Sequence, residues 1–153
     1  RNNPEGKLVL IGDGVARRKV EQTIQEHDVE NSVELTGIVS HHEAIKQMAC
    51  FDVLVLPSDT EGLPRVIIES FELGVPVVAT PVGGVTELLT HERTGLLVDP
   101  TSDSIASALH RLYDDPKLRS NLSQNAYEAV ADRNWDTVRR KVETGYEMGL
   151  ADS

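Results

Sequence analysis

The sequence predicts an α/β domain in which a parallel sheet is flanked by helices. Short apolar runs alternate with longer helical patterns from end to end, which is typical of right-handed strand–helix–strand crossovers. The runs are continuously apolar, as in KLVLI at 7–11, and strands buried on both faces need such runs. A length of 153 residues suits one domain, so we expect 1–153 to form a single one.

The predicted elements alternate along the chain. Strands are expected at 7–11, 32–35, 53–56, 75–79 and 96–98, and helices at 15–28, 41–50, 64–73 and 85–89. The first helix is expected to carry Val15, Val20 and Ile24 on one apolar stripe among charged residues. The tail from 102 to 149 predicts two or three more helices, with breaks near Pro116 and Asn134.

Local signals explain several boundaries. Ser40 and Glu43 fit a capping box, because the serine hydroxyl can accept from the Glu43 amide while the Glu43 carboxylate can accept from the Ser40 amide. Pro64 suits the first turn of a helix, where its missing N–H would be unpaired in any case. Gly37 and Gly74 stand where the chain leaves one element and turns into the next.

Composition excludes several classes of protein. Twenty-five acidic residues against 15 basic ones give a net charge of −10, which argues against non-specific binding to nucleic acid or anionic lipid. No stretch approaches the roughly 18–20 apolar residues of a membrane span. A single cysteine rules out a disulfide framework, and together with the acid excess and low aromatic content it favours a cytoplasmic protein.

The first glycine-rich segment, Gly12-Asp13-Gly14, follows the first predicted strand. A dinucleotide-binding fingerprint would need a third glycine at position 17, and Arg17 stands there instead. We therefore favour a tight strand-to-helix turn over a nicotinamide dehydrogenase.

The segment from 57 to 69 is a stronger candidate for a binding site. A strand ends, a polar loop follows, and a helix opens at Pro64. The amides of Gly62, Leu63 and Arg65 would cluster at this helix N-terminus, where the helix dipole favours an anion such as a diphosphate. Gly62 would let a ligand approach the backbone closely, and the Arg65 side chain would add a cation.

Acidic residues surround this predicted anion site. Glu61 lies in the loop, within reach of any group attached to a bound phosphate, whereas Glu69 lies more than a turn into the helix. The helix is apolar around most of its circumference, so a carboxylate at its margin needs a partner, and a pair of sugar hydroxyls would serve. The alternative is that the acids are ordinary solvated residues. We favour that alternative for Glu72 and leave it open for Glu69.

The remaining candidates are weaker. Gly83 and Gly84 follow the fourth predicted strand, and they indicate either a second anion-binding nest or a turn with a backbone role only. The adjacent His41 and His42 cannot share one helix face, and no acid–histidine set at metal spacing accompanies them. We expect no metal site.

The string EGLPRVIIESFELGVPVVATPVGG, in which seven residues separate Glu61 from Glu69, resembles the signature of the group 1 (family 4) glycosyltransferases. The similarity continues in LVLIGDG, VELTGIVS, FDVLVLPS, TGLLVDP and LYDDPKLRSNL. The chain thus looks like the C-terminal, donor-binding half of a GT-B enzyme, a Rossmann-like parallel sheet flanked by helices.

The resemblance implies a retaining transfer of a sugar from a UDP-, GDP- or ADP-linked donor, without a bound metal or other cofactor. It places a catalytic role on Glu61, near the transferred sugar, and ribose binding on Glu69. It places Val39 beside the nucleotide base. The residues that bind the donor diphosphate and sugar would be Gly62, Leu63, Pro64 and Arg65.

The chain also departs from the family pattern. The family normally has one more strand and helix ahead of this chain, with an Arg and a Lys that hold the donor phosphates, and an N-terminal acceptor domain. The extra strand lies between the strands equivalent to 7–11 and 53–56. Either those two pair directly, or another chain fills the gap, or the natural protein is longer. We favour the last, and expect the isolated fragment to be inactive and to bind donor weakly.

Other functions compete with this interpretation. One alternative is a non-catalytic nucleotide-sugar-binding or assembly subunit of the same fold. A sugar-nucleotide epimerase is disfavoured by the GLP within the signature. Acceptors in the family often lie at membranes, so the full-length protein would associate with a membrane peripherally. The donor sugar, the base and the acceptor do not follow from these residues.

Overall fold

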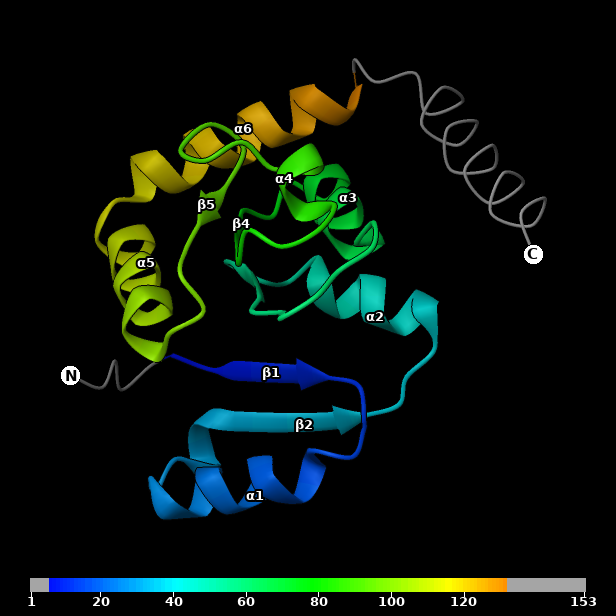
Figure 1. Cartoon of the computed structure of the whole chain (residues 1–153), viewed down its shortest axis with the longest axis vertical. Helices are drawn as coiled ribbons and strands as arrows, with labels where there is room; N and C mark the ends of the chain where they lie inside the picture. Colours follow the sequence, from blue (N-terminus) through cyan, green and yellow to red (C-terminus); the bar gives the residue numbers. More distant parts are fainter. Residues whose placement is uncertain (1–5, 132–153) are drawn as a thin grey trace. The chain divides into compact units, whose positions relative to one another are not determined.

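The computed structural model describes residues 6–131, and its elements follow the predicted order (Figure 1). Most predicted elements are present with ends trimmed by one or two residues, and the α/β class with parallel strands is confirmed. The elements are β1 (Leu8–Ile11), α1 (Arg17–Glu26), the 3-10 turn η1 (Glu30–Ser32), β2 (Val33–Gly37), α2 (His41–Met48), β3 (Leu54–Leu56), α3 (Arg65–Glu72), β4 (Val77–Ala79), α4 (Val85–Leu88), β5 (Leu96–Leu97), α5 (Ser102–Asp114) and α6 (Pro116–Ala131).

The chain divides into two compact units, residues 1–47 and 48–153, and its described strands form two parallel sheets. One sheet contains β1 and β2, and the other has the order β3-β4-β5. Within the described ranges β1 pairs with β2 alone and β3 with β4 alone.

In the first unit, α1 carries the chain from the end of β1 back to the start of β2 (Figure 1). The predicted apolar stripe is wrong at Val15. This residue lies in the turn before α1, with its side chain as exposed as in an extended peptide (108%). Gly37 ends β2 at φ +68°, and its carbonyl accepts a hydrogen bond of 3.0 Å from the Gly12 amide. The turns after both strands are thus tied together.

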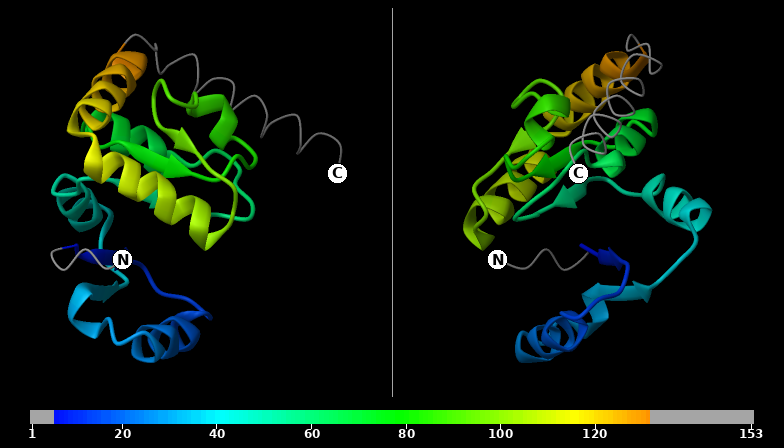
Figure 2. Two further views of the ribbon diagram at one scale, coloured as in Figure 1. Left: turned by 90° about the vertical axis from the view of Figure 1, so that its left-hand side faces the viewer. Right: turned by 45° about the vertical axis from the view of Figure 1, so that its right-hand side comes forward.

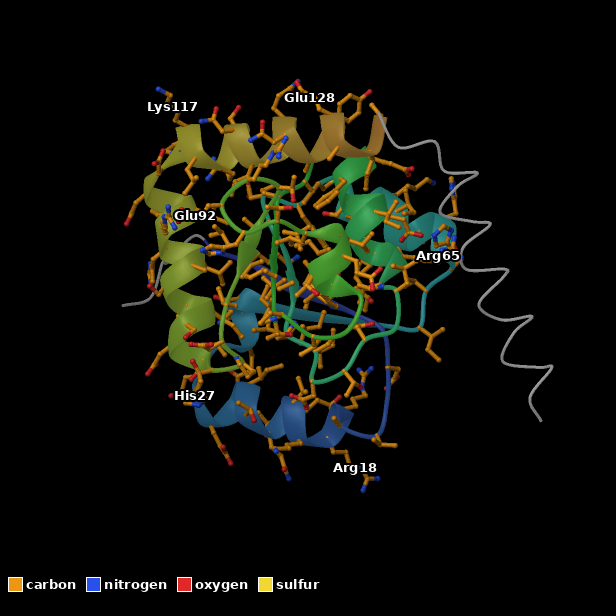
Figure 3. The ribbon with its side chains drawn as sticks, turned by 45° about the horizontal axis from the view of Figure 1, so that its top comes forward. Arg18, His27, Arg65, Glu92, Lys117 and Glu128 are labelled. Carbon is orange, nitrogen blue, oxygen red and sulfur yellow. The ribbon has the colours of Figure 1, made fainter. Side chains whose placement is uncertain are left out.

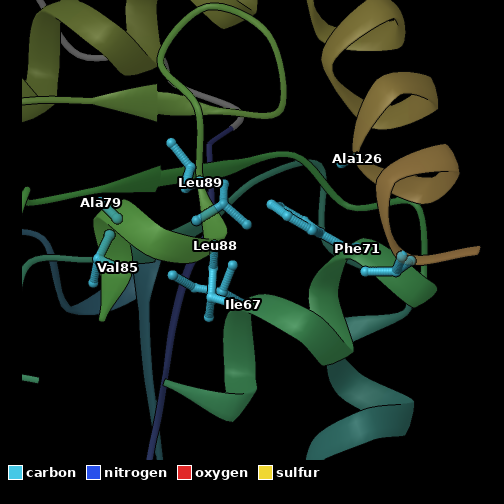
Figure 4. Packing of buried hydrophobic residues seen from close by; sticks show 9 residues of the cluster. Ile67, Phe71, Ala79, Val85, Leu88, Leu89 and Ala126 are labelled. Carbon is cyan, nitrogen blue, oxygen red and sulfur yellow. The ribbon is translucent and has the colours of Figure 1, made fainter. Parts of the chain in front are cut away.

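The second unit holds an apolar core on both faces of β4. Val77 and Ala79 pack with residues of α3, α4 and α6, whereas Val78 packs with residues of α5 and with Leu122 of α6. Figure 4 shows the first cluster, in which Phe71 lies close to α6. In the left view of Figure 2, α5 lies in front of the strands of this sheet and α3 behind them. All three residues of β4 are buried, and they alternate between the two clusters because successive side chains of a strand point to opposite faces.

Two of the predicted helix boundaries are stabilised by hydrogen bonds from backbone amides to side chains. The Glu43 amide donates to the Ser40 hydroxyl oxygen at 3.2 Å, which is one half of the capping box. Between α5 and α6, the Leu118 amide donates to Asp115 Oδ1 at 2.9 Å, so the predicted break before Pro116 is present. The predicted break near Asn134 lies outside the described residues.

Candidate functional site

The candidate site lies between β3 and α3, in the second unit. Pro64 stands immediately before α3 in an extended conformation (φ −72°, ψ 99°), one position earlier than the predicted first turn. No side chain caps this end of the helix, and the Pro64 carbonyl accepts from the Ile67 amide at 3.1 Å. The fixed φ of proline suits this position, so the sequence determines where α3 begins.

The N-terminus of α3 carries backbone N–H groups with no acceptor in the described part of the chain. They are the amides of Gly62, Leu63, Arg65 and Val66. Unpaired amides at the start of a helix add to the positive end of its dipole, and they are satisfied by water or by an anion. Such amides can bind an anion, and those of Gly62, Leu63 and Arg65 are the ones that the sequence predicts for this purpose.

Glu61 differs from an ordinary solvated acid. Its side chain is half-buried, and the Ser58 hydroxyl donates a hydrogen bond of 2.6 Å to Oε1. No hydrogen bond to Oε2 occurs among residues 6–131. The carboxylate is thus oriented through Oε1, and in the chain Glu61 directly precedes Gly62, the first residue with an unpaired amide.

Glu69 and Glu72 lie on the same helix in different surroundings. The Glu69 side chain is 18% exposed, and Oε1 lies 3.8 Å from the Arg65 guanidinium, one turn earlier. Arg65 itself is 81% exposed and extends from the surface (Figure 3). Glu72 is exposed, as predicted. The Glu69 carboxylate is therefore largely shielded from solvent, which disfavours the alternative of an ordinary solvated acid at this position.

The glycine pair after β4 packs against the same loop, which the sequence did not reveal. The Gly84 amide donates to the Gly62 carbonyl at 2.8 Å. A Cβ atom built on Gly83 would lie 1.8 Å from the carbonyl oxygen of Glu61, and one on Gly84 would lie 2.1 Å from that of Gly62. Gly83 also has φ +49°. These glycines allow two backbones to meet where no side chain would fit.

A buried threonine links the two loops further. Thr80 has no exposed surface, and its hydroxyl donates to the Ser58 carbonyl at 2.5 Å. Its amide donates to the Leu56 carbonyl at 3.2 Å, continuing the pairing of β4 with β3. The loops after these adjacent parallel strands are therefore joined at the carboxyl ends of the strands, which is where ligands bind in open α/β sheets.

Val39, the predicted base-binding residue, belongs to the first unit and follows β2. It is half-buried, whereas the neighbouring Ile38 is 87% exposed. The structure places Val39 in the loop between β2 and α2, at the carboxyl end of its sheet, as the sequence predicts.

The Gly12-Asp13-Gly14 turn is stabilised within itself. Asp13 accepts from the Gly14 amide at 2.8 Å and from the Arg17 guanidinium at 3.1 Å. Arg17 also donates to Glu21 at 2.8 Å, and this bond, with the charges of both acids, raises the pKa of the guanidinium. The position that would need a third glycine is thus occupied by an ion-paired side chain, which supports the turn over the dinucleotide fingerprint.

No group of three or more His, Cys, Asp and Glu side chains among the described residues could hold a metal ion. None of the helices described is long and apolar enough to cross a membrane.

Comparison with known proteins decides the family. The model of the glycosyl transferases group 1 family matches residues 1–129. The chain belongs to this family. Among its curated relatives, the alpha-D-kanosaminyltransferase of Streptomyces kanamyceticus is 35% identical over 127 residues, which cover 82% of this chain and 33% of the relative. The group 1 chain spans about a third of the length of the curated relatives it matches.

Solved structures agree with this family. Anabaena HepE in complex with UDP-glucose shares 27% identity at a TM-score of 0.82, over 95% of this chain and 42% of its own. The C-terminal domain of a group 1 glycosyl transferase from Francisella tularensis shares 27% identity at a TM-score of 0.79, over 86% of this chain and 71% of its own. The fold is thus that of the C-terminal, Rossmann-like half of GT-B glycosyltransferases.

Proposed function

We propose that this group 1 chain is the donor-binding half of a retaining glycosyltransferase, with 1–153 as one nucleotide-sugar-binding domain. The observation that carries the proposal is the N-terminus of α3, where unpaired amides lie next to the oriented carboxylate of Glu61 and one turn before the shielded carboxylate of Glu69. Amides suit a diphosphate, and carboxylates suit the hydroxyls of a sugar and a ribose.

The reaction explains why such a site needs no metal. As the bond between the sugar and the diphosphate breaks, negative charge grows on the leaving diphosphate and positive charge on the anomeric carbon. The fixed amides of Leu63, Arg65 and Val66 would stabilise the negative charge on the diphosphate, and they would not have to move to do so. Glu61 would bind hydroxyls of the transferred sugar and stabilise the positive charge. Arg65 would contribute a cation at the rim of the site.

The nucleoside would be bound by two further groups. Glu69 would accept from the ribose hydroxyls, and its low exposure supports this role because hydrogen bonds to an ionised carboxylate are stronger where water is largely excluded. The backbone beside Val39 would lie against the base. The complex of Anabaena HepE with UDP-glucose supports a UDP-linked donor as the first to test, before GDP- and ADP-sugars.

The rest of the reaction belongs to the longer protein that the relatives' lengths suggest. An N-terminal domain would bind the acceptor, and the acidic composition of this chain favours a cytoplasmic site of action. Peripheral association of the full-length protein with a membrane would bring it to a membrane-bound acceptor.

Calorimetry of the full-length protein with UDP-glucose, GDP-mannose and ADP-glucose tests the proposal. We expect Glu69→Ala to weaken binding of the preferred donor about 10- to 100-fold, because hydrogen bonds to a charged group contribute about 1.5–3 kcal/mol. Glu72→Ala is the matched control, since it removes an exposed carboxylate from the same helix. Equal affinities of the two variants would refute the ribose assignment. Unaltered turnover of Glu61→Ala would refute the catalytic role of this residue, and donor binding without any turnover by the wild type would favour a non-catalytic binding subunit.

A further inference from the structure

We propose that Ser58 is a positioning residue for transfer, and that its hydroxyl orients the Glu61 carboxylate toward the transferred sugar. The inference rests on the proposed function, since it assigns a purpose to a bond within the same site. Glu61 is the residue that would touch the substrate, and Ser58 would act through it.

The contact between the two side chains is short and has a direction. The Ser58 hydroxyl lies 2.6 Å from Oε1 of Glu61, within the range of an O–H donor bonded to an ionised carboxylate. Both residues are half-buried. Because the serine hydroxyl occupies Oε1, the rotation of the carboxylate is restricted and Oε2 is left for a hydroxyl of the sugar.

Ser58 is itself held by the buried end of β4. The hydroxyl of Thr80, which has no exposed surface, donates to the Ser58 carbonyl at 2.5 Å. Two hydrogen bonds thus connect the core to the carboxylate, the first from Thr80 to Ser58 and the second from Ser58 to Glu61. A side chain positioned through such a chain is preorganised before the substrate binds.

The backbone of Glu61 is restricted from the opposite direction. Gly83 lies so close to the Glu61 carbonyl that an added Cβ would stand 1.8 Å from its oxygen, and the Gly84 amide bonds the next carbonyl. Glu61 is therefore held at its main chain by the loop after β4 and at its side chain by Ser58.

The residues between Ser58 and Glu61 provide the comparison. Asp59 and Thr60 are both exposed, and no hydrogen bond of the Thr60 hydroxyl occurs in the described part of the chain. Thr60→Ala therefore removes a hydroxyl from the same loop, two residues away, without breaking a bond. It is the matched control for Ser58→Ala.

The test uses the full-length protein and water as the acceptor. Release of nucleoside diphosphate is measured from UDP-glucose, GDP-mannose and ADP-glucose, and the donor hydrolysed fastest by the wild type is kept. In this assay water forms a bond to the anomeric carbon, the bond to the diphosphate breaks, and the proton of water passes to solvent. Affinity for the nucleoside diphosphate alone, which lacks the sugar, is measured by calorimetry.

We expect Ser58→Ala to lower kcat about 10- to 100-fold, the loss that misplacement of a reacting group by an ångström can cause. Affinity for the nucleoside diphosphate should stay within about twofold, because the amides of α3 are unchanged. Ser58→Thr should restore most of kcat since it keeps the hydroxyl, and Thr60→Ala should match the wild type. Adding Ser58→Ala to Glu61→Ala should cause no further loss.

Several outcomes would overturn the inference. If Ser58→Ala turns over as fast as Thr60→Ala while Glu61→Ala is slow, the role of Ser58 is refuted and the proposed function stands. If Ser58→Ala lowers the affinity for the nucleoside diphosphate by as large a factor as it lowers kcat, the bond from Ser58 to Glu61 only supports the loop. If the wild type hydrolyses none of the donors, or Glu61→Ala keeps full turnover, the proposed function fails first.

Discussion

Replacing Gly83 with alanine tests the contact between the two loops of the site. The added methyl group would have to adopt φ +49° and would lie 1.8 Å from the Glu61 carbonyl oxygen, where real Cβ atoms stay beyond 3.0 Å. Relief of the clash requires the loops to separate by more than an ångström. Because both atoms belong to the main chain, no side-chain rotation can provide that space.

Alanine substitutions at two other glycines separate the two causes of the destabilisation expected for Gly83→Ala. Gly74 has φ +69° with open space around it, so Gly74→Ala measures the left-handed conformation alone, about 1–2 kcal/mol. Gly84 has an ordinary φ of −68° and a Cβ site 2.1 Å from the Gly62 carbonyl oxygen, so Gly84→Ala measures overpacking, about 1–3 kcal/mol. Gly83→Ala combines both effects and should lower the free energy of unfolding by about 2–5 kcal/mol.

Urea denaturation followed by circular dichroism measures these differences. The urea concentration at the midpoint of unfolding should fall least for Gly74→Ala and most for Gly83→Ala. The dependence of the unfolding free energy on urea concentration should not change. The reasoning is refuted if Gly83→Ala is no less stable than Gly74→Ala, because the loops would then not be in contact. Calorimetry provides a second measurement, because displacement of Glu61 should also lower the affinity for the donor.

Further predictions concern single side chains. Gly62→Ala should change the free energy of unfolding by no more than about 0.5 kcal/mol, because the space around its Cβ position is open. If the ligand lies against this backbone, the variant should bind nucleoside diphosphate about tenfold more weakly in calorimetry. An unchanged affinity would refute a ligand contact at Gly62. Phe71→Ala should cost about 3–5 kcal/mol in urea denaturation, since its ring is 2% exposed, whereas Glu72→Ala should cost almost nothing. The bond from Arg111 lowers the pKa of Glu92, so their ion pair stabilises the fold above about pH 4.5 and loses this effect as the pH falls through the lowered pKa. Arg111→Gln should therefore lower the melting temperature slightly at about pH 7 and not at about pH 2.5, and an equal decrease at both values would contradict the assignment.

The order of the elements and many of their ends could be predicted because the signals are local. Ser40 and Asp115 each bond an amide three residues ahead, and Pro64 stands directly before α3. Val15 shows the limit of such patterns. Its spacing fits a helical stripe, but the turn that follows Gly14 delays the helix until Arg17, so the side chain faces solvent.

The sequence predicts the part of the candidate site that comes from one continuous segment, but not the contacts with the loop after β4. Glu61, Glu69 and the amides between them belong to one segment, and a strand, a proline and a helix are enough to place them. The contact of this loop with Gly83 and Gly84 joins residues more than twenty positions apart, and the Thr80–Ser58 bond spans 22. A glycine pair indicates close packing but not its partner, which depends on the pairing of β3 with β4.

Backbone contact between the two loops also has an evolutionary consequence. Neither main chain can shift unless the other moves as well, so acceptable substitutions at 61–62 and at 83–84 are expected to depend on one another. Libraries that diversify only 83–84 should therefore yield mostly destabilised variants. Randomising both together would give the fold a chance to accommodate a new substrate.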